Sequence, residues 1–133
     1  MKTTLQLAKH IKEFHFGGNW TAANLKDLIA NVSWQQANTS VFKLNSIATL
    51  VFHINYYIHG VLAVLEGKPL EIKDAFSFDL PPIHSEEDWE KLKRNTFNDA
   101  EKFVELIEKL PHTTLSDNFT DEKYGNYFRN ILG

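Results

Sequence analysis

The stretch that decides the fold is residues 46–67, SIATLVFHINYYIHGVLAVLEG. Ser46 is a suitable N-cap, and Gly67 followed by Pro69 prevents a helix from continuing. We therefore predict a long helix from about residue 47 to about residue 66. Apolar residues at three- and four-residue intervals form one face of this helix, namely Ile47, Leu50, Val51, Ile54, Ile58, Val61, Leu62 and Leu65.

This helix is better explained as part of a protein core than as a membrane span. Polar side chains and a glycine interrupt its apolar residues, at His53, Asn55, Tyr56, Tyr57, His59 and Gly60. The N-terminal stretch MKTTLQLAKHIKEF carries charges among its apolar positions and has no signal-peptide core. We therefore expect a cytoplasmic protein with no membrane partner.

Three other segments have helical periodicity. The first ends at about Phe16, before a pair of glycines, and its inward face is formed by Thr4, Leu7, Ala8, Ile11, Phe14 and His15. The second begins after Ser85, which resembles a capping box with Asp88, and ends before Pro111. Its predicted core face holds Trp89, Leu92, Ala100, Phe103, Leu106, Ile107 and Leu110. Thr120 can cap the last segment, in which we expect Tyr124, Phe128 and Ile131 to face inward.

The connecting segments contain shorter elements. Thr21 is a plausible N-cap for a short helix over residues 22–30, and Ser33 can cap another turn that carries Trp34 and Ala37. Residues 67–84, GKPLEIKDAFSFDLPPIH, have no regular period, and their paired prolines exclude a helix there. Because this segment is rich in aromatic residues, we predict an ordered loop packed across one end of a helical bundle.

Length and composition indicate one all-α domain over residues 1–133, because helices with one apolar face each must bury those faces together. The chain has 133 residues, of which 43% are hydrophobic and 23% charged. It has no cysteine, which excludes disulfides, a thiolate nucleophile and a cysteine-based zinc site. Its net charge of −3 argues against nucleic-acid binding.

Histidines are the main candidates for chemistry. His53 lies on the flank of the apolar stripe, with Tyr57 one turn later, so it can point toward a metal or substrate between helices. A half-buried histidine bonded to a carbonyl or to a tyrosine is the more common explanation of such a position. His15 belongs to the inward face of the first helix and can meet His53 across the core, or it can interact with the last carbonyls of its own helix. His59 projects from another side of the helix that carries His53.

Asp99 falls near the middle of the apolar face of the helix after Ser85. A carboxylate in such a place must be paired, ligate a metal or reach solvent. It can serve as a base or oxygen ligand in a substrate pocket with Tyr57 and His15, or it can pair with Lys102 or with a tyrosine hydroxyl. Periodicity alone leaves both possibilities open.

Four segments together resemble the DinB-like family, which includes YfiT-type metal-dependent hydrolases and bacterial low-molecular-weight thiol transferases. They extend over nearly the whole chain, and the second is the most specific. In order they are GGNWTAANLKDLIANVSWQQA (17–37), NSIATLVFHINYYIHGVLAVLEGKPL (45–70), SEEDWEKLKRNTFNDAEKFVELIEKLP (85–111) and YGNYFRNILG (124–133).

The resemblance implies a four-helix bundle in up-down-down-up order, with a long crossover between the second and third helices. It also implies a divalent metal, commonly nickel or zinc, held by a histidine on the second helix and by an H-x-x-x-H motif on the fourth. His53 matches the first of these ligands, and the other two have no counterpart in this sequence. We expect either that the sequence stops short of the motif or that this member has lost the metal.

Two functions follow as expectations. The first is a metal-dependent hydrolase or thiol or group transferase that acts on a small molecule and forms a homodimer, as members of the family do. The second is a metal-free helical bundle that binds a small molecule or serves as a dimerising structural protein. Substrate identity is not encoded in any motif of this sequence.

Overall fold

The computed structural model describes residues 3–18, 23–120 and 125–132, and within these ranges the chain is helical and contains no β-strand. An isolated antiparallel bridge joins Asn118 and Asn126. The prediction of an all-α fold is confirmed. The long helices are α1 (Thr3–Phe16), α4 (Ile47–Leu65) and α5 (Glu86–Lys109), and the shorter elements are α2 (Leu25–Ile29), α3 (Trp34–Ala37), η1 (Asp74–Phe76), η2 (His112–Ser116) and α6 (Tyr127–Leu132).

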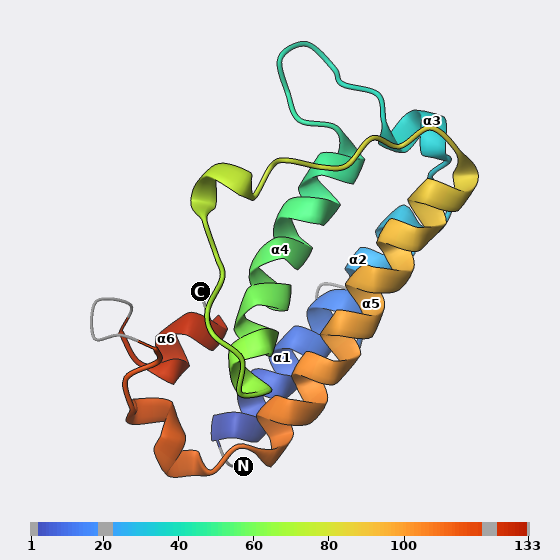
Figure 1. The fold of residues 1–133 in the computed structure, drawn as a ribbon. Coiled ribbons are helices and arrows are strands. Elements are labelled where there is room, and N and C mark those ends of the chain that lie inside the picture. The colour runs from blue at the N-terminus through green and yellow to red at the C-terminus, as the bar shows by residue number, and fades with distance from the viewer. Residues whose placement is uncertain (1–2, 19–22, 121–124, 133) are drawn as a thin grey trace.

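The three long helices lie side by side (Figure 1). α4 and α5 both begin at the end of the molecule where α2 and α3 lie, and both run toward the opposite end, whereas α1 runs the other way. Because α4 and α5 run in the same direction, the chain between them must return along the length of the molecule. α5 packs closely against both α1 and α4, while α1 and α4 approach each other much less closely within the described residues.

The predicted starts of the two longest helices are confirmed. The Oγ atom of Ser46 accepts a hydrogen bond from the backbone N–H of Thr49 at 3.1 Å, and Ser85 accepts one from Asp88 at 3.2 Å. The Asp88 carboxylate accepts from the N–H of His84, at 2.9 Å, which is one residue before the N–H that a regular capping box uses. Ser33 caps α3 as predicted, and the structure adds that it forms a complete capping box with Gln36.

Two shorter predicted helices differ from the structure. α2 begins at Leu25, because the side chain of Asn24 accepts from the N–H of Asp27 and caps it there; the predicted cap, Thr21, lies outside the described residues. α6 begins at Tyr127, where the side chain of Asn126 accepts from the N–H of Arg129; the residues directly after the predicted cap, Thr120, lie outside the described ranges. Of its predicted inward residues, Ile131 is buried, Phe128 is exposed and Tyr124 lies outside the described residues.

The core is divided into two clusters along the long helices. At the end near α2 and α3, Trp89 is fully buried and its indole N–H donates to the carbonyl of Val32 at 2.9 Å. The second cluster joins α1, α4 and α5 to η2 and α6, through Leu7, Ile11, Leu62, Phe103, Ile107 and Ile131 among others. This second cluster forms the floor on which the candidate site described below is built.

The crossover of residues 66–84 first runs back alongside α4 and then crosses the end of the molecule at which α4 and α5 begin (Figure 1). The predicted path across an end therefore describes only its second part, where Leu80 and Ile83 pack against the core cluster of α2 and α3. Two contacts attach it. The hydroxyl of Tyr56 donates to the carbonyl of Lys73 at 3.0 Å and accepts from the N–H of the same residue at 2.9 Å. One turn further along α4, the side chain of Ile72 lies directly over Gly60, where there is no room for a Cβ atom.

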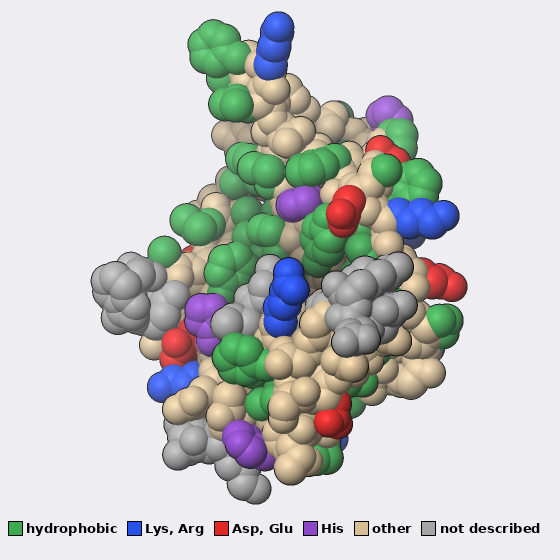
Figure 2. Space-filling view, turned by 90° about the vertical axis from the view of Figure 1, so that its left-hand side faces the viewer, with side chains coloured by type: hydrophobic (Ala, Val, Ile, Leu, Met, Phe, Trp, Pro, Cys, Tyr) green, Lys and Arg blue, Asp and Glu red, His purple; other side chains and the backbone are tan. Residues whose placement is uncertain are grey.

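An apolar loop projects from the end of the molecule at which α4 begins (Figure 2). Val41, Phe42 and Leu44 are 57%, 94% and 68% exposed, and Phe42 is the one non-glycine residue with positive φ in the described ranges, at 56°. Among the described helices, α4 alone is long and apolar enough to cross a membrane by length and composition, with a mean hydropathy of 1.5. Core helices of soluble proteins meet the same criterion.

The contact between Gly60 and Ile72 leads to a testable prediction. Gly60→Ala should destabilise the protein by about 1–3 kcal/mol, because the added methyl group displaces the crossover from α4. In an Ile72→Ala background the same change should be neutral, or stabilising by up to about 1 kcal/mol, because alanine favours the helix. Urea denaturation of the four proteins measures both effects. A stabilising Gly60→Ala change in the wild-type background would contradict the observed packing.

Candidate functional site

A cavity of about 410 Å³ lies where α1 and α4 diverge. Its position follows from the packing described above, since α5 contacts both helices and the space between them is left unfilled. The described residues that line it come from α1, α4, α5 and α6, and they are His10, Ile11, Phe14, His15, His53, Ile54, Tyr57, Ile58, Val61, Phe103, Asn130 and Ile131. The structure thus brings His15, His53 and Tyr57 to one cavity.

Aromatic rings hold the imidazole of His53 at the cavity wall. The ring of Phe78, from the crossover, stacks on it with a centroid distance of 4.0 Å and an interplanar angle of 6°. Tyr57 contacts the same imidazole edge-on at 5.3 Å. The Nδ1 atom of His53 is buried and has no hydrogen-bond partner among the described residues. His53 is therefore fixed in place by packing, while one of its ring nitrogens stays available.

His15 is more deeply buried, with 1% of its surface exposed. Its Nδ1 atom lies 2.9 Å from the backbone carbonyl oxygen of Ile11. A carbonyl oxygen can only accept, so the hydrogen of a neutral imidazole must be on Nδ1, which leaves Nε2 as an acceptor. That Nε2 atom is buried and has no partner in the described part of the chain. The bond to a carbonyl of its own helix, predicted as one alternative, is thus present, and it leaves the second nitrogen free for a ligand.

Burial also keeps His15 uncharged. Loss of contact with water lowers the pKa of His15 below the ordinary value of 6.5, and the bond to Ile11, which acts in the opposite direction, does not offset it. The neutral ring, with its lone pair on Nε2, therefore persists to lower pH than in an exposed histidine. A neutral imidazole nitrogen is the form that accepts a hydrogen bond or binds a metal.

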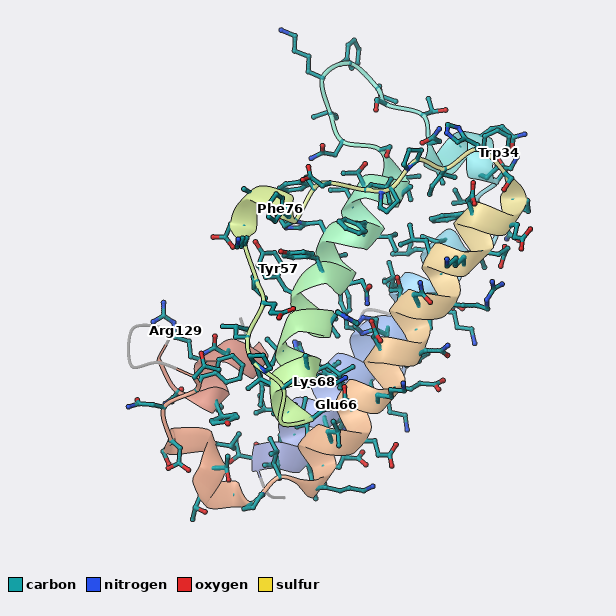
Figure 3. The ribbon with its side chains drawn as sticks, in the orientation of Figure 1. Trp34, Tyr57, Glu66, Lys68, Phe76 and Arg129 are labelled. Atoms are coloured by element: carbon teal, nitrogen blue, oxygen red, sulfur yellow. The ribbon has the colours of Figure 1, made fainter. Side chains whose placement is uncertain are left out.

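The crossover also positions Tyr57. The hydroxyl of Tyr57 donates to a carboxylate oxygen of Asp74, at 2.9 Å, in the turn η1. Tyr57 lies on the side of α4 that faces the crossover, near the turn η1 that carries Phe76 (Figure 3). Because its proton is already donated to Asp74, the Tyr57 hydroxyl has only its lone pairs left for another group. Tyr57 therefore acts first as an aromatic wall of the cavity.

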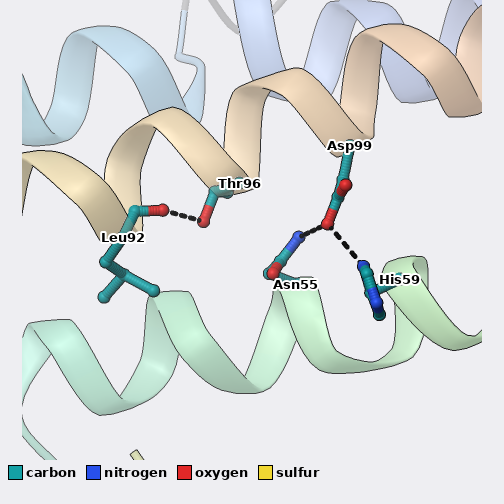
Figure 4. Close-up of polar contacts among 5 residues, drawn as sticks. All are labelled: Asn55, His59, Leu92, Thr96 and Asp99. Atoms are coloured by element: carbon teal, nitrogen blue, oxygen red, sulfur yellow. Dashed lines mark hydrogen bonds and ion pairs between the residues drawn. The ribbon is translucent and has the colours of Figure 1, made fainter. Parts of the chain in front are cut away.

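Asp99 does not line this cavity, contrary to the expectation that it shares a pocket with His15 and Tyr57. One of its oxygens accepts from the side-chain amide of Asn55 at 3.0 Å and lies 2.9 Å from Nδ1 of His59 (Figure 4). These three residues line a separate cavity of about 440 Å³. Within the described residues, the partners of Asp99 are thus Asn55 and His59 rather than Lys102 or a tyrosine. The structure agrees that His53 and His59 lie on different sides of α4, because each lines a different cavity.

Two features of the site were not predicted from the sequence. Phe78 and Asp74 belong to the crossover, far from His53 and Tyr57 in sequence, and no spacing rule connects them. Only the aromatic content of residues 67–84 indicated that this segment would be ordered. Within the described ranges, no group of three or more His, Asp or Glu residues is arranged to hold a metal ion.

The lowered pKa of His15 predicts acid sensitivity. As the pH falls below about 6.5, the unfolded chain takes up a proton at His15 while the folded chain does not, so acid favours unfolding. The stability that comes from keeping His15 neutral in the folded state is fully present above about pH 6.5, and it is lost as the pH falls toward the lowered pKa of His15. His15→Leu should therefore lose less stability than the wild type between about pH 7.5 and about pH 5, measured by urea denaturation. The exposed control His112→Gln should behave as the wild type. An equal acid-induced loss in His15→Leu would contradict the prediction.

Comparisons with known proteins returned no match: no protein-family model fits the chain, and neither the curated proteins nor the solved structures include one similar to it at the level searched. What the protein does must therefore be argued from the cavity itself.

Proposed function

We propose that the protein is a DinB-like metal-dependent enzyme, a hydrolase or a thiol or group transferase, whose substrate is a small molecule bound between α1 and α4. The observation that carries this proposal is the buried, unpartnered Nδ1 atom of His53 at the wall of a cavity of about 410 Å³. Buried polar atoms without partners are uncommon and often mark functional sites. The cavity volume is in the range typical of small-molecule sites.

The residues at the cavity fit a divalent metal in part. His53 and His15 each present a ring nitrogen without a partner, and neutral imidazole is a preferred ligand of nickel and zinc. A catalytic zinc site normally has three protein ligands, and the described residues do not assemble three. The family pattern supplies the rest from an H-x-x-x-H motif that this sequence does not contain. We propose His53 as the ligand from this chain.

Such a metal, when bound, lowers the pKa of a coordinated water or thiol and so provides a nucleophile near neutral pH. The chain contributes orientation and exclusion of water. Phe78 and Tyr57 fix the plane of the His53 ring, and Asp74 fixes Tyr57 in turn. Apolar side chains such as Ile54, Ile58 and Phe103 line the cavity, and electrostatic interactions next to such walls are stronger than in bulk water.

We also propose the finer architecture of this family, a four-helix bundle in up-down-down-up order with its crossover between the second and third long helices. The directions of α1, α4 and α5 support it, as does the return of the crossover along α4. In this arrangement α6 is the fourth helix, and Asn130 and Ile131 line the cavity from it. The proposed setting is the cytoplasm, with no nucleic-acid partner, in keeping with the net charge of −3.

A homodimer is proposed as the assembly. The side chains of Val41, Phe42 and Leu44 are exposed, and they are the apolar surface that a second copy would cover. Light scattering on the purified protein measures its mass in solution.

The second candidate is a metal-free binder of small molecules. It is favoured by the absence of three assembled metal ligands among the described residues, together with the largely apolar walls of the cavity. It requires only the pocket, with His15 and His53 as polar groups on its lining. Metal analysis separates the two candidates.

The decisive experiment compares two histidines on the same helix. The protein expressed from its natural reading frame should contain stoichiometric nickel or zinc. His53→Ala should lose at least about 90% of it, because an imidazole ligand contributes most of the affinity at such a site. His59→Ala should retain it, because His59 lies at a different cavity. Absence of metal from the wild-type protein, or equal loss in both variants, would overturn the enzyme proposal.

A further inference from the structure

We propose that the cavity between α1 and α4 selects uncharged, largely apolar molecules that carry an O–H or N–H group, and that this group donates its hydrogen to Nε2 of His15. The inference names the substrate class of the site proposed above, and it rests on that proposal only in taking the cavity as the place where substrate binds. It requires no metal.

The walls of the cavity define the body of the ligand. No Asp, Glu, Lys or Arg is among the described residues that line it, so a charged ligand would lose its hydration without gaining an opposite charge. Most of the lining is aliphatic or aromatic, including Ile54, Val61, Phe14 and Phe103. Aromatic walls favour a ring that can pack against them edge-on or offset. A volume of about 410 Å³ admits one aromatic ring or a fused pair.

The polar end of the ligand is defined by His15. The bond from Nδ1 to the Ile11 carbonyl sets the tautomer, so Nε2 can only accept. Burial lowers the pKa of His15, which keeps the ring in this accepting form at neutral pH. A ligand that lacks a donor leaves the buried Nε2 atom unsatisfied, as it is among the described residues without a ligand, whereas a ligand whose O–H or N–H group reaches this atom gains a hydrogen bond. The difference in affinity between ligands with and without an O–H or N–H group therefore comes from Nε2 of His15.

The other polar groups of the cavity are less selective. The proton of the Tyr57 hydroxyl is donated to Asp74, and His53 has no hydrogen bond at Nδ1 that would set its tautomer. His10 is exposed and lies at the rim. Asn130 also lines the cavity, and its side-chain amide donates to the carbonyl of Asn126 at 2.9 Å. His15 is the buried lining histidine whose ring hydrogen is placed by the fold, so that its other nitrogen accepts.

Matched probes test this directly. Phenol and anisole share a ring and differ in that anisole has no O–H, and indole and 1-methylindole differ in the same way at nitrogen. Calorimetric titration of the full-length protein, treated with a chelator, should show phenol and indole binding roughly tenfold more tightly than their methylated partners. Benzoate, which is charged, should not bind measurably.

Variants assign the effect to one atom. His15→Leu preserves an apolar side chain of similar size and should reduce the difference between phenol and anisole to about twofold or less, because both ligands then meet an apolar wall. His112→Gln, an exposed histidine outside the cavity, should keep the full difference. If His15→Leu does not fold, nitrogen NMR of the wild-type histidine rings provides the second measurement, in which phenol should shift the Nε2 signal of His15 and anisole should not.

The outcomes also separate this inference from the proposed enzyme. Equal affinity for phenol and anisole in the wild type, or a difference that persists in His15→Leu, overturns the inference, whatever the metal content of the protein. Metal that depends on His53 would still support the enzyme. If the difference depends on His15 and no metal is found, the inference stands and the enzyme proposal does not.

Discussion

The packing of α5 against both α1 and α4 is the constraint from which the rest of the structure follows. Ala8 on α1 and Ala100 on α5 are fully buried, and such small side chains allow two helices to approach closely. α4 packs against another part of α5, so α1 and α4 contact α5 more than each other. The space left between them is the cavity. Its floor includes Phe103, which is itself buried in the core cluster that joins all three helices.

The crossover packs along one face of α4 and fixes the side chains on that face. Residues 53, 56, 57 and 60 lie on one face of the helix, because they are separated by three, four and seven positions. The crossover runs antiparallel to α4 and contacts that face in reverse order, with Phe78 on His53, Asp74 and Lys73 on the two tyrosines, and Ile72 on Gly60. One segment thus holds the histidine ring, the tyrosine beside it and the helix that carries both. Its length and its aromatic residues are explained by this single role.

Features set within a few residues of each other could be predicted from the sequence, and those that depend on how helices face one another could not. Ser46 and Ser85 were identified as caps because an N-cap bonds to a backbone group three residues away. Asp99 was misplaced because its position around α5 was read from periodicity alone. Its partners are two side chains of α4, and only the relative rotation of the two helices brings them to it. The same holds for the stacking of Phe78 on His53, which depends on the path of the crossover.

The two cavity histidines differ in a way that bears on their roles. The tautomer of His15 is set within its own helix, because Nδ1 donates to the carbonyl of Ile11 four residues earlier. Its Nε2 atom can therefore only accept a hydrogen bond, whatever else binds. Among the described residues, His53 is held by ring contacts with Phe78 and Tyr57, and no hydrogen bond fixes the role of its Nδ1 atom. A core built only for stability would place leucine or phenylalanine at both positions, because a buried nitrogen without a partner is unfavourable. Retaining two such nitrogens at one apolar cavity is a cost to the folded state that a bound ligand offsets. In the function proposed above, the fixed acceptor of His15 would recognise the substrate and the imidazole of His53 would take part in the chemistry.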